Sequence, residues 1–153
     1  MTANEYSEKY NYIIQSVEAI TNNVDYSISN MANITAILWE NMDNINWAGF
    51  YIMRNGELQL GPFQGKVACT RIALGKGVCG TAAEKDETQL VKNVHEFPGH
   101  IACDSASNSE IVIPIHHDGR VCGVLDIDSP IIGRFDEEDC IALEKVVQIL
   151  ESR

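Results

Sequence analysis

The chain has 153 residues, of which 45% are hydrophobic and 22% are charged, as expected for one ordinary globular domain. Its 11 basic and 22 acidic residues give a formal net charge of −11, which disfavours binding to nucleic acid or to an anionic membrane surface. The N-terminus lacks a secretory or transit pattern, and no apolar run approaches the ~18 residues that a membrane span needs. We therefore expect a single cytosolic domain over residues 1–153 with a small-molecule partner.

The predicted elements begin with two helices and continue as a strand meander. Apolar residues recur every three or four positions over residues 6–20 and again over residues 24–41, which is typical of amphipathic helices. From residue 47 onward the pattern is that of strands, and an Asn-Gly pair predicts a tight hairpin between residues 47–53 and 57–63. A third strand is expected over residues 67–72.

The second half of the chain is expected to contain a long irregular segment, a second hairpin and a closing helix. Pro114 predicts that its strand has no partner on the N–H side at that position. The expected elements are a glycine-rich loop at 74–80, a short helix at 81–84, a strand at 89–93, an irregular segment at 95–109, a hairpin of strands at 110–115 and 120–128, and a helix that begins after the N-cap Asp136.

Three acidic residues of the second hairpin are candidates for a binding or acid-base site. Side chains alternate along a strand, so Asp126 and Asp128 are expected on one face together with Cys122 and Val124. Like charges about 7 Å apart raise each other's pKa and need a cation or a proton between them. Glu110 opens the neighbouring strand and adds a third carboxylate. The alternative is a rim of solvated acids, which strand parity alone does not exclude.

Signatures of a metal site and of a hydrolase are weak. The cysteines are spaced 10, 24, 19 and 18 residues apart and include no Cys-x-x-Cys pair. The sequence also has no His-x-x-x-His pair and no EF-hand loop, so we predict no metal. Three carboxylates remain the best argument for Mg²⁺ or Ca²⁺. Ser105, His95 and Asp104 have the residue types of a catalytic triad, but no nucleophile elbow surrounds the serine.

The five cysteines differ in their sequence context. Cys122 lies in a predicted strand and Cys140 on the apolar face of the last helix, where a thiol usually acts as a small hydrophobic group. Cys69, Cys79 and Cys103 lie at a strand or in predicted loops, where a thiol is accessible and can meet another thiol. That arrangement is typical of disulfide exchange through a sulfenic acid. Three incidental loop cysteines are the alternative interpretation.

Two aromatic residues are candidates for the wall of a small pocket. Trp47 and Tyr51 are four residues apart on a predicted strand and share a face, and Gly49 between them leaves room for a ligand. Ordinary core positions are the simpler interpretation of the same pair.

The order of the elements resembles that of the GAF domain, in which an antiparallel sheet holds a small-molecule pocket under loops. Seven ordered segments are more specifically similar to the free methionine-R-sulfoxide reductases. They are Trp47–Tyr51, Gly61–Gly65, Ala68–Cys69, Gly75–Gly80, Cys103–Ser107, Ser109–Pro114 and Gly123–Ser129. The resemblance implies an α+β, GAF-like fold: a central antiparallel sheet with the N-terminal helices and the C-terminal helix packed on it, and active-site loops on the other side.

The resemblance also implies a chemistry. Free L-methionine-(R)-sulfoxide is reduced to methionine without a bound cofactor, thioredoxin supplies the electrons, and the enzyme is usually a homodimer. In that family the cysteine that matches Cys103 is the nucleophile, the one that matches Cys69 resolves the intermediate, and the one that matches Cys79 is an auxiliary thiol. The pocket residues of the family match Trp47, Tyr51, Glu110, Asp126 and Asp128.

Two functions of other classes use some of the same residues. A non-catalytic GAF module that senses a nucleotide or an amino acid keeps its affinity when Cys103 is replaced by Ser and consumes no reductant. A thiol peroxidase or redox switch uses the cysteines but does not need Asp126 and Asp128.

Overall fold

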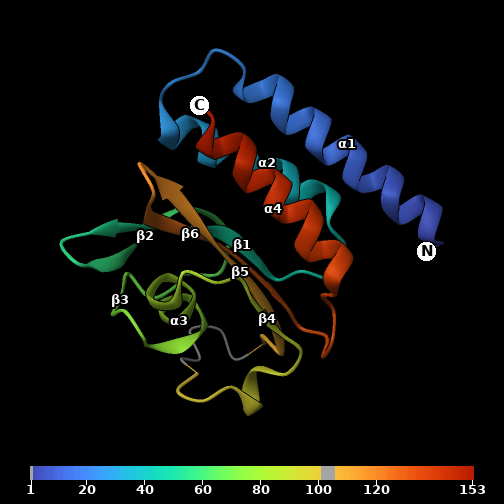
Figure 1. Ribbon diagram of the computed structural model, residues 1–153. Helices are drawn as coiled ribbons and strands as arrows, with labels where there is room; N and C mark the ends of the chain where they lie inside the picture. Colours follow the sequence, from blue (N-terminus) through green and yellow to red (C-terminus); the bar gives the residue numbers. More distant parts are fainter. Residues whose placement is uncertain (1, 101–105) are drawn as a thin grey trace.

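The computed structural model of the chain describes residues 2–100 and 106–153. Three helices, α1 (Ala3–Thr21), α2 (Ser27–Asn41) and α4 (Glu137–Glu151), form a layer on one face of a sheet (Figure 1). The main contacts of α1 are with α2 and α4, whereas α2 and α4 also contact the strands. None of the described helices is long and apolar enough to cross a membrane.

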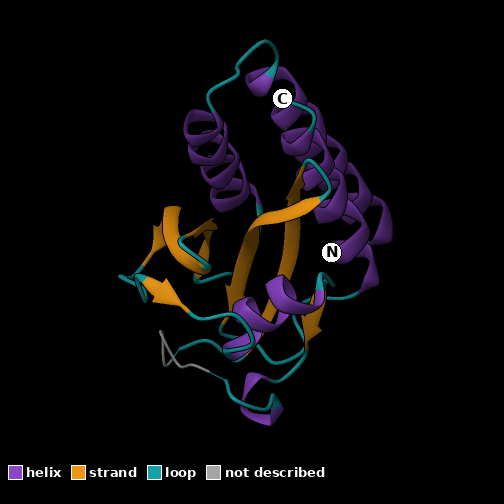
Figure 2. Ribbon diagram, turned by 60° about the vertical axis from the view of Figure 1, so that its left-hand side comes forward, coloured by secondary structure: helices purple, strands orange, loops and turns teal. Residues whose placement is uncertain are grey.

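The sheet has six strands, and every neighbouring pair is antiparallel. In spatial order they are β3 (Arg71–Ile72), β2 (Glu57–Gly65), β1 (Trp47–Arg54), β6 (Arg120–Ser129), β5 (Ser109–His117) and β4 (Gln89–Val91). The short helix α3 (Gly77–Lys85) and the 3₁₀ turn η1 (Val94–Glu96) lie on the side of the sheet away from the long helices (Figure 2). This is the predicted α+β architecture, with helices on one face and loops on the other.

Alternation along the strands separates two hydrophobic clusters. On β5, Ile111 and Ile113 pack toward the long helices, whereas Val112 packs in the cluster that includes α3. On β6, Leu125 faces the helices and Val124 faces α3. Both faces of these central strands are covered. Their amino-acid sequences are therefore nearly continuous apolar runs, interrupted by a few acidic residues.

Both predicted hairpins and the predicted N-cap of the last helix are present. Asn55 and Asp118 have positive φ and are each followed by a positive-φ glycine, as a type I′ turn requires. Asp136 caps α4 in a capping box with Asp139, which confirms the predicted start of that helix. β4 pairs with β5 only opposite residues 110–112, so Pro114 has no strand partner on that side, as predicted.

The predicted third strand is much shorter than expected. Only the two residues of β3 pair with β2, and the rest of residues 67–72 is irregular. The hydroxyl of Tyr51 donates to the carbonyl oxygen of Cys69 at 2.9 Å, so a side chain takes an acceptor that a strand ladder would use. Val67 is 88% exposed, so this segment also lacks an apolar face for the sheet to bury.

The prediction that side chains alternate strictly between the two faces of β6 is wrong at Cys122. Gly123 pairs with Ile115 and Val121 pairs with His116, which leaves Cys122 as an extra residue in a β-bulge. As a result, Cys122 packs against the helix-side cluster and Val121 against the pocket-side cluster. Its expected packing role remains, but it does not share a face with the two acidic residues of its strand.

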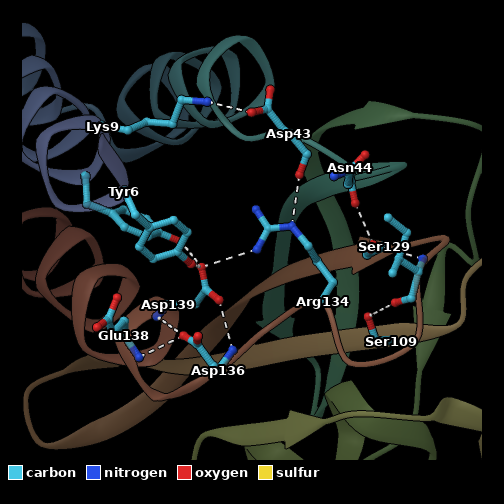
Figure 3. A network of polar contacts seen from close by, with 12 residues as sticks. Tyr6, Lys9, Asp43, Asn44, Ser109, Ser129, Arg134, Asp136, Glu138 and Asp139 are labelled. Atoms are coloured by element: carbon cyan, nitrogen blue, oxygen red, sulfur yellow. Dashed lines mark hydrogen bonds and ion pairs between the residues drawn. The ribbon is translucent and has the colours of Figure 1, made fainter. Parts of the chain in front are cut away.

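A buried polar network holds α1 against the start of α4 (Figure 3). One oxygen of Asp139 accepts from the hydroxyls of Tyr6 and Tyr10 and from Arg134 Nη1, the last at 3.4 Å. Arg134 also donates from Nε to the carbonyl oxygen of Asp43 at 3.0 Å. The network therefore joins α1, the segment before β1 and the N-terminus of α4.

We expect Tyr10→Phe to lower the free energy of unfolding by about 1–2 kcal/mol, because it removes a donor to a buried carboxyl oxygen. Tyr12→Phe, on an exposed position of the same helix, changes stability by at most about 0.5 kcal/mol. Urea unfolding of both variants measures the difference. Equal stability of the two variants contradicts a structural role for the network.

Candidate active site

A narrow pocket lies between the sheet and α3, on the face away from the long helices. Its volume is about 40 Å³. The lining residues come from β1, from β3 and the segment before it, from α3 and its N-cap, from β5 and the segment before it, and from β6. They are Trp47, Tyr51, Val67, Ala68, Ile72, Lys76, Gly77, Val78, Cys79, His100, Ser107, Glu110, Asp126 and Asp128.

Three carboxyl groups meet at this pocket because of the sheet register. Glu110 on β5 is directly opposite Asp128 on β6, and Asp126 lies two residues earlier on the same face of β6. Glu110 is 7% exposed and Asp126 is 5% exposed, while Asp128 is partly exposed. The structure brings the three groups together as predicted, and a rim of solvated acids is wrong because Glu110 and Asp126 are buried.

The crowding changes the acidity of all three groups. Burial raises the pKa of Glu110 and of Asp128 well above the usual range, and repulsion from Asp126 raises both further. Burial also raises the pKa of Asp126, but hydrogen bonds from Glu110 and Cys79 oppose that rise. Asp126 is therefore the site where a negative charge is best supported, and its neighbours hold protons at higher pH than ordinary carboxyl groups do.

Asp128 is held by polar residues outside the sheet. Ser107 Oγ donates to Asp128 Oδ2 at 3.4 Å, and Asn46 Nδ2 donates to Ser107 Oγ at 3.1 Å. The Oδ1 atoms of Asp126 and Asp128 are buried and have no hydrogen-bond partner in the described part of the chain. Each of these oxygens can accept a hydrogen bond or contact a cation.

An aromatic stack forms one wall of the pocket. The ring of Trp47 lies 5.8 Å from that of Tyr51 and 5.2 Å from that of Phe63, with interplanar angles of 21° and 14°. The indole N–H of Trp47 donates to the carbonyl oxygen of Lys66 at 3.1 Å, which fixes the ring. A Cβ on Gly49 would lie 2.3 Å from Phe63 Cβ, so Phe63, and not a ligand, takes the room that the glycine leaves.

Cys79 lies in a helix and not in an accessible loop. The helix α3 begins at Gly77, several residues before the predicted start, and Gly80 allows it to pack closely, since a Cβ there would lie 2.4 Å from the carbonyl oxygen of Ala73. The thiol of Cys79 is buried, and its Sγ is 3.9 Å from Glu110 Oε1. Burial, and then repulsion by Asp126 and Glu110, raise the pKa of this thiol well above its usual value.

The other cysteines are placed differently. Cys69 is disulfide-bonded and packs beside the pocket-side cluster, whereas Cys122 and Cys140 are free and partly buried. Burial raises the pKa of Cys140 to about 12, as expected for a packing thiol. Cys103 lies outside the described residues.

Residues 26–153 match the GAF domain family. A free methionine-R-sulfoxide reductase of Escherichia coli (strain K12) is 52% identical over 124 residues, which are 81% of this chain and 75% of that one. One from Saccharomyces cerevisiae is 44% identical over 146 residues, which are 90% and 81% of the two chains. The chain belongs to the free methionine-R-sulfoxide reductase family.

A solved structure supports the same assignment. The free methionine-R-sulfoxide reductase of Neisseria meningitidis, in complex with its substrate, superimposes with a TM-score of 0.90 at 43% sequence identity. The match covers 94% of this chain and 86% of that one. The GAF fold of this free methionine-R-sulfoxide reductase family member is therefore established by sequence and by structure.

Some lining residues of this family member were not singled out as candidates from its sequence. Lys76 and Ser107 lie inside the segments that carry the family resemblance, so the signal was present but did not distinguish them. His100 carries no sequence signal, because it lines the pocket from an irregular segment. The suggested triad gains no support, since His95 Nε2 pairs with Asn108 Oδ1 at 2.8 Å and the other two residues lie outside the described part.

Glu110 is expected to make folding stability depend on pH. Its pKa is higher in the folded chain than the ordinary value of 4.5, so the folded state keeps a proton that the unfolded state loses as the pH rises. The free energy of unfolding should therefore fall as the pH rises from the ordinary value of 4.5 through neutral pH. Glu110→Gln stays neutral and should make this decline shallower.

Urea unfolding across this pH range measures the slope. Glu8→Gln, at an exposed position of α1, serves as the matched control and should retain the slope of the unaltered chain. Parallel curves for the unaltered chain and Glu110→Gln would show that this carboxyl group does not hold its proton through folding.

Proposed function

We propose that the chain reduces free L-methionine-(R)-sulfoxide to L-methionine. The observation that carries this proposal is a buried cluster of three carboxyl groups beside a stacked aromatic wall. Family membership gives the reaction class, and the pocket supplies groups that match each part of this substrate.

The amino group of the substrate matches the acidic end of the pocket. An ammonium group carries N–H donors and a positive charge, which suit the unpartnered oxygens of Asp126 and Asp128. The methyl and methylene groups suit the face of Trp47, and the carboxylate suits Lys76, the lysine among the lining residues. The same acids disfavour a nucleotide, because its phosphates would meet buried carboxyl groups.

The chemical step transfers one oxygen from sulfur to sulfur. The Cys103 thiolate attacks the sulfoxide sulfur, the oxygen moves from that sulfur to the cysteine sulfur, and the bond between the two sulfur atoms breaks. Methionine leaves, and Cys103, now oxidised, is a sulfenic acid. A carboxyl group that still holds its proton, Glu110 or Asp128, protonates the oxygen as negative charge develops on it. This role needs a carboxyl group that holds its proton at a higher pH than usual, and burial raises the pKa of both groups in that direction.

The catalytic cycle is completed by a second thiol. Cys69 condenses with the sulfenic acid, releasing water and forming a disulfide, and a dithiol donor, thioredoxin, reduces that disulfide. The disulfide-bonded state of Cys69 supports this role, and no prosthetic group is required. The role of Cys103 rests on the family likeness. Cys79 is an auxiliary thiol, and the protein works as a cytosolic homodimer.

The reaction is tested by methionine release from the separate R and S epimers, with thioredoxin, its reductase and NADPH. We expect turnover of the R epimer alone and its loss in Cys103→Ser, because the nucleophile is then absent. Cys122→Ser, a packing position, should retain turnover. No turnover of either epimer by the reduced, folded chain would leave a binding module as the function.

Asp126→Asn separates the reductase from a thiol peroxidase. Loss of the carboxylate should lower the rate with methionine sulfoxide by about 10²-fold or more, because both amino-group binding and proton transfer depend on the cluster. The rate with hydrogen peroxide in the same thioredoxin assay should change much less. A comparable loss with peroxide, or unchanged sulfoxide reduction, contradicts the role of the acids.

A further inference from the structure

Three side chains from three separate elements place potential metal ligands together in the pocket. They are Cys79 in the first turn of α3, Glu110 on β5 and Asp126 on β6. One ligand atom from each lies within 4.8 Å of the other two, and Cys79 Sγ is 3.9 Å from Glu110 Oε1. All three residues are buried, so the group is not an ordinary cluster of surface acids.

A second observation is that buried carboxyl oxygens of the cluster lack a partner among the residues that the structure describes. Asp126 is 5% exposed, and its Oδ1 atom lacks a hydrogen-bond partner within the described residues. Asp128 Oδ1, on the same face of β6, is buried and unpartnered in the same way. A buried acceptor without a partner is costly, and a cation or a donor group removes that cost.

The donor set selects the kind of cation. A thiolate is a soft ligand that Mg²⁺ and Ca²⁺ do not favour, whereas Zn²⁺ binds mixed sulfur and oxygen sets. In a tetrahedral zinc site the ligand atoms are about 3.4–3.6 Å apart, given Zn–S of about 2.3 Å and Zn–O of about 2.1 Å. The 3.9 Å between Cys79 and Glu110 needs only a small side-chain adjustment to reach this range.

We propose that the pocket binds one zinc-class divalent cation through Cys79 Sγ and one oxygen each of Glu110 and Asp126. The thiol and any protonated carboxyl group release their protons as the metal binds, and no electrons are transferred. The divalent charge offsets the repulsion among three close anionic ligands. Three protein ligands leave a fourth position open to water, as in an accessible zinc site.

The bound cation would occupy the acidic end of the pocket, where the proposed function places the amino group of the substrate. Zinc binding and substrate binding therefore exclude each other, so zinc is a reversible inhibitor that a chelator removes. This consequence rests on the proposed function, whereas the metal site itself does not.

Binding is tested with Co²⁺ as a spectroscopic substitute for Zn²⁺, because a thiolate bound to Co²⁺ gives a charge-transfer absorption band. The starting protein is the full chain with Cys69→Ser and Cys103→Ser, which removes the two thiols of the proposed redox cycle. We expect one Co²⁺ per chain and displacement of the band by one equivalent of Zn²⁺.

Two further substitutions in this protein assign the ligands. Cys79→Ser should abolish the band, whereas Cys122→Ser, at a packing position, should leave it unchanged. Asp126→Asn should retain the thiolate band but weaken Co²⁺ binding by at least about tenfold. Far-ultraviolet circular dichroism checks that each variant is folded. If Cys79→Ser does not fold, Asp126→Asn still tests the site. The proposed site is overturned if the starting protein gives no band or if the band persists in folded Cys79→Ser. It is also overturned if folded Asp126→Asn binds Co²⁺ with unchanged affinity.

The activity measurement is separate. With the unaltered chain, Zn²⁺ should inhibit turnover of the R epimer, the inhibition should weaken as methionine sulfoxide is raised, and EDTA should restore the rate. Cobalt binding without any turnover would reject the proposed function and keep the metal site. Turnover that is insensitive to Zn²⁺, together with absence of the cobalt band, would reject the metal site alone.

Discussion

Three carboxyl groups crowded into one buried pocket are the constraint on which the rest of the structure depends. Glu110 and Asp128 face each other across β5 and β6, and Asp126 lies on the same face two residues away. Three anions cannot be buried together without positive charge, so the cluster must hold protons or a cation. The pocket is thus unfavourable for folding when it is empty and fully ionised, and becomes favourable when a proton, an ammonium group or a metal enters.

The fold tolerates this cost because stability and chemistry are on opposite faces of the sheet. The face toward α1, α2 and α4 is apolar, with fully buried residues such as Ile34, Leu38 and Ile127, and the network around Asp139 ties the helices together. The opposite face carries the acids, the aromatic stack and the short helix α3. A central strand such as β6 serves both faces at once, because alternate residues point in opposite directions.

Much of this arrangement could be predicted from the sequence, because it depends on local periodicity. The shared face of Asp126 and Asp128 follows from strand parity, and the hairpin that adds Glu110 follows from its turn residues. The bulge at Cys122 could not be predicted, since it depends on pairing with another strand. The burial of Cys79 likewise depends on where α3 packs, and a zinc-type donor set drawn from three elements has no characteristic spacing.

The sequence context of Cys79 predicted a thiol that is both accessible and reactive, and the structure supports neither property. An attacking thiol needs exposure and a low pKa, but this thiol is buried among acids that raise its pKa well above the usual value. The thiol acts as a hydrogen-bond donor toward Glu110 and Asp126, and positive charge beside it favours its ionised form. The acids that favour a cationic ligand therefore also keep the cysteine next to them unreactive until that charge is supplied.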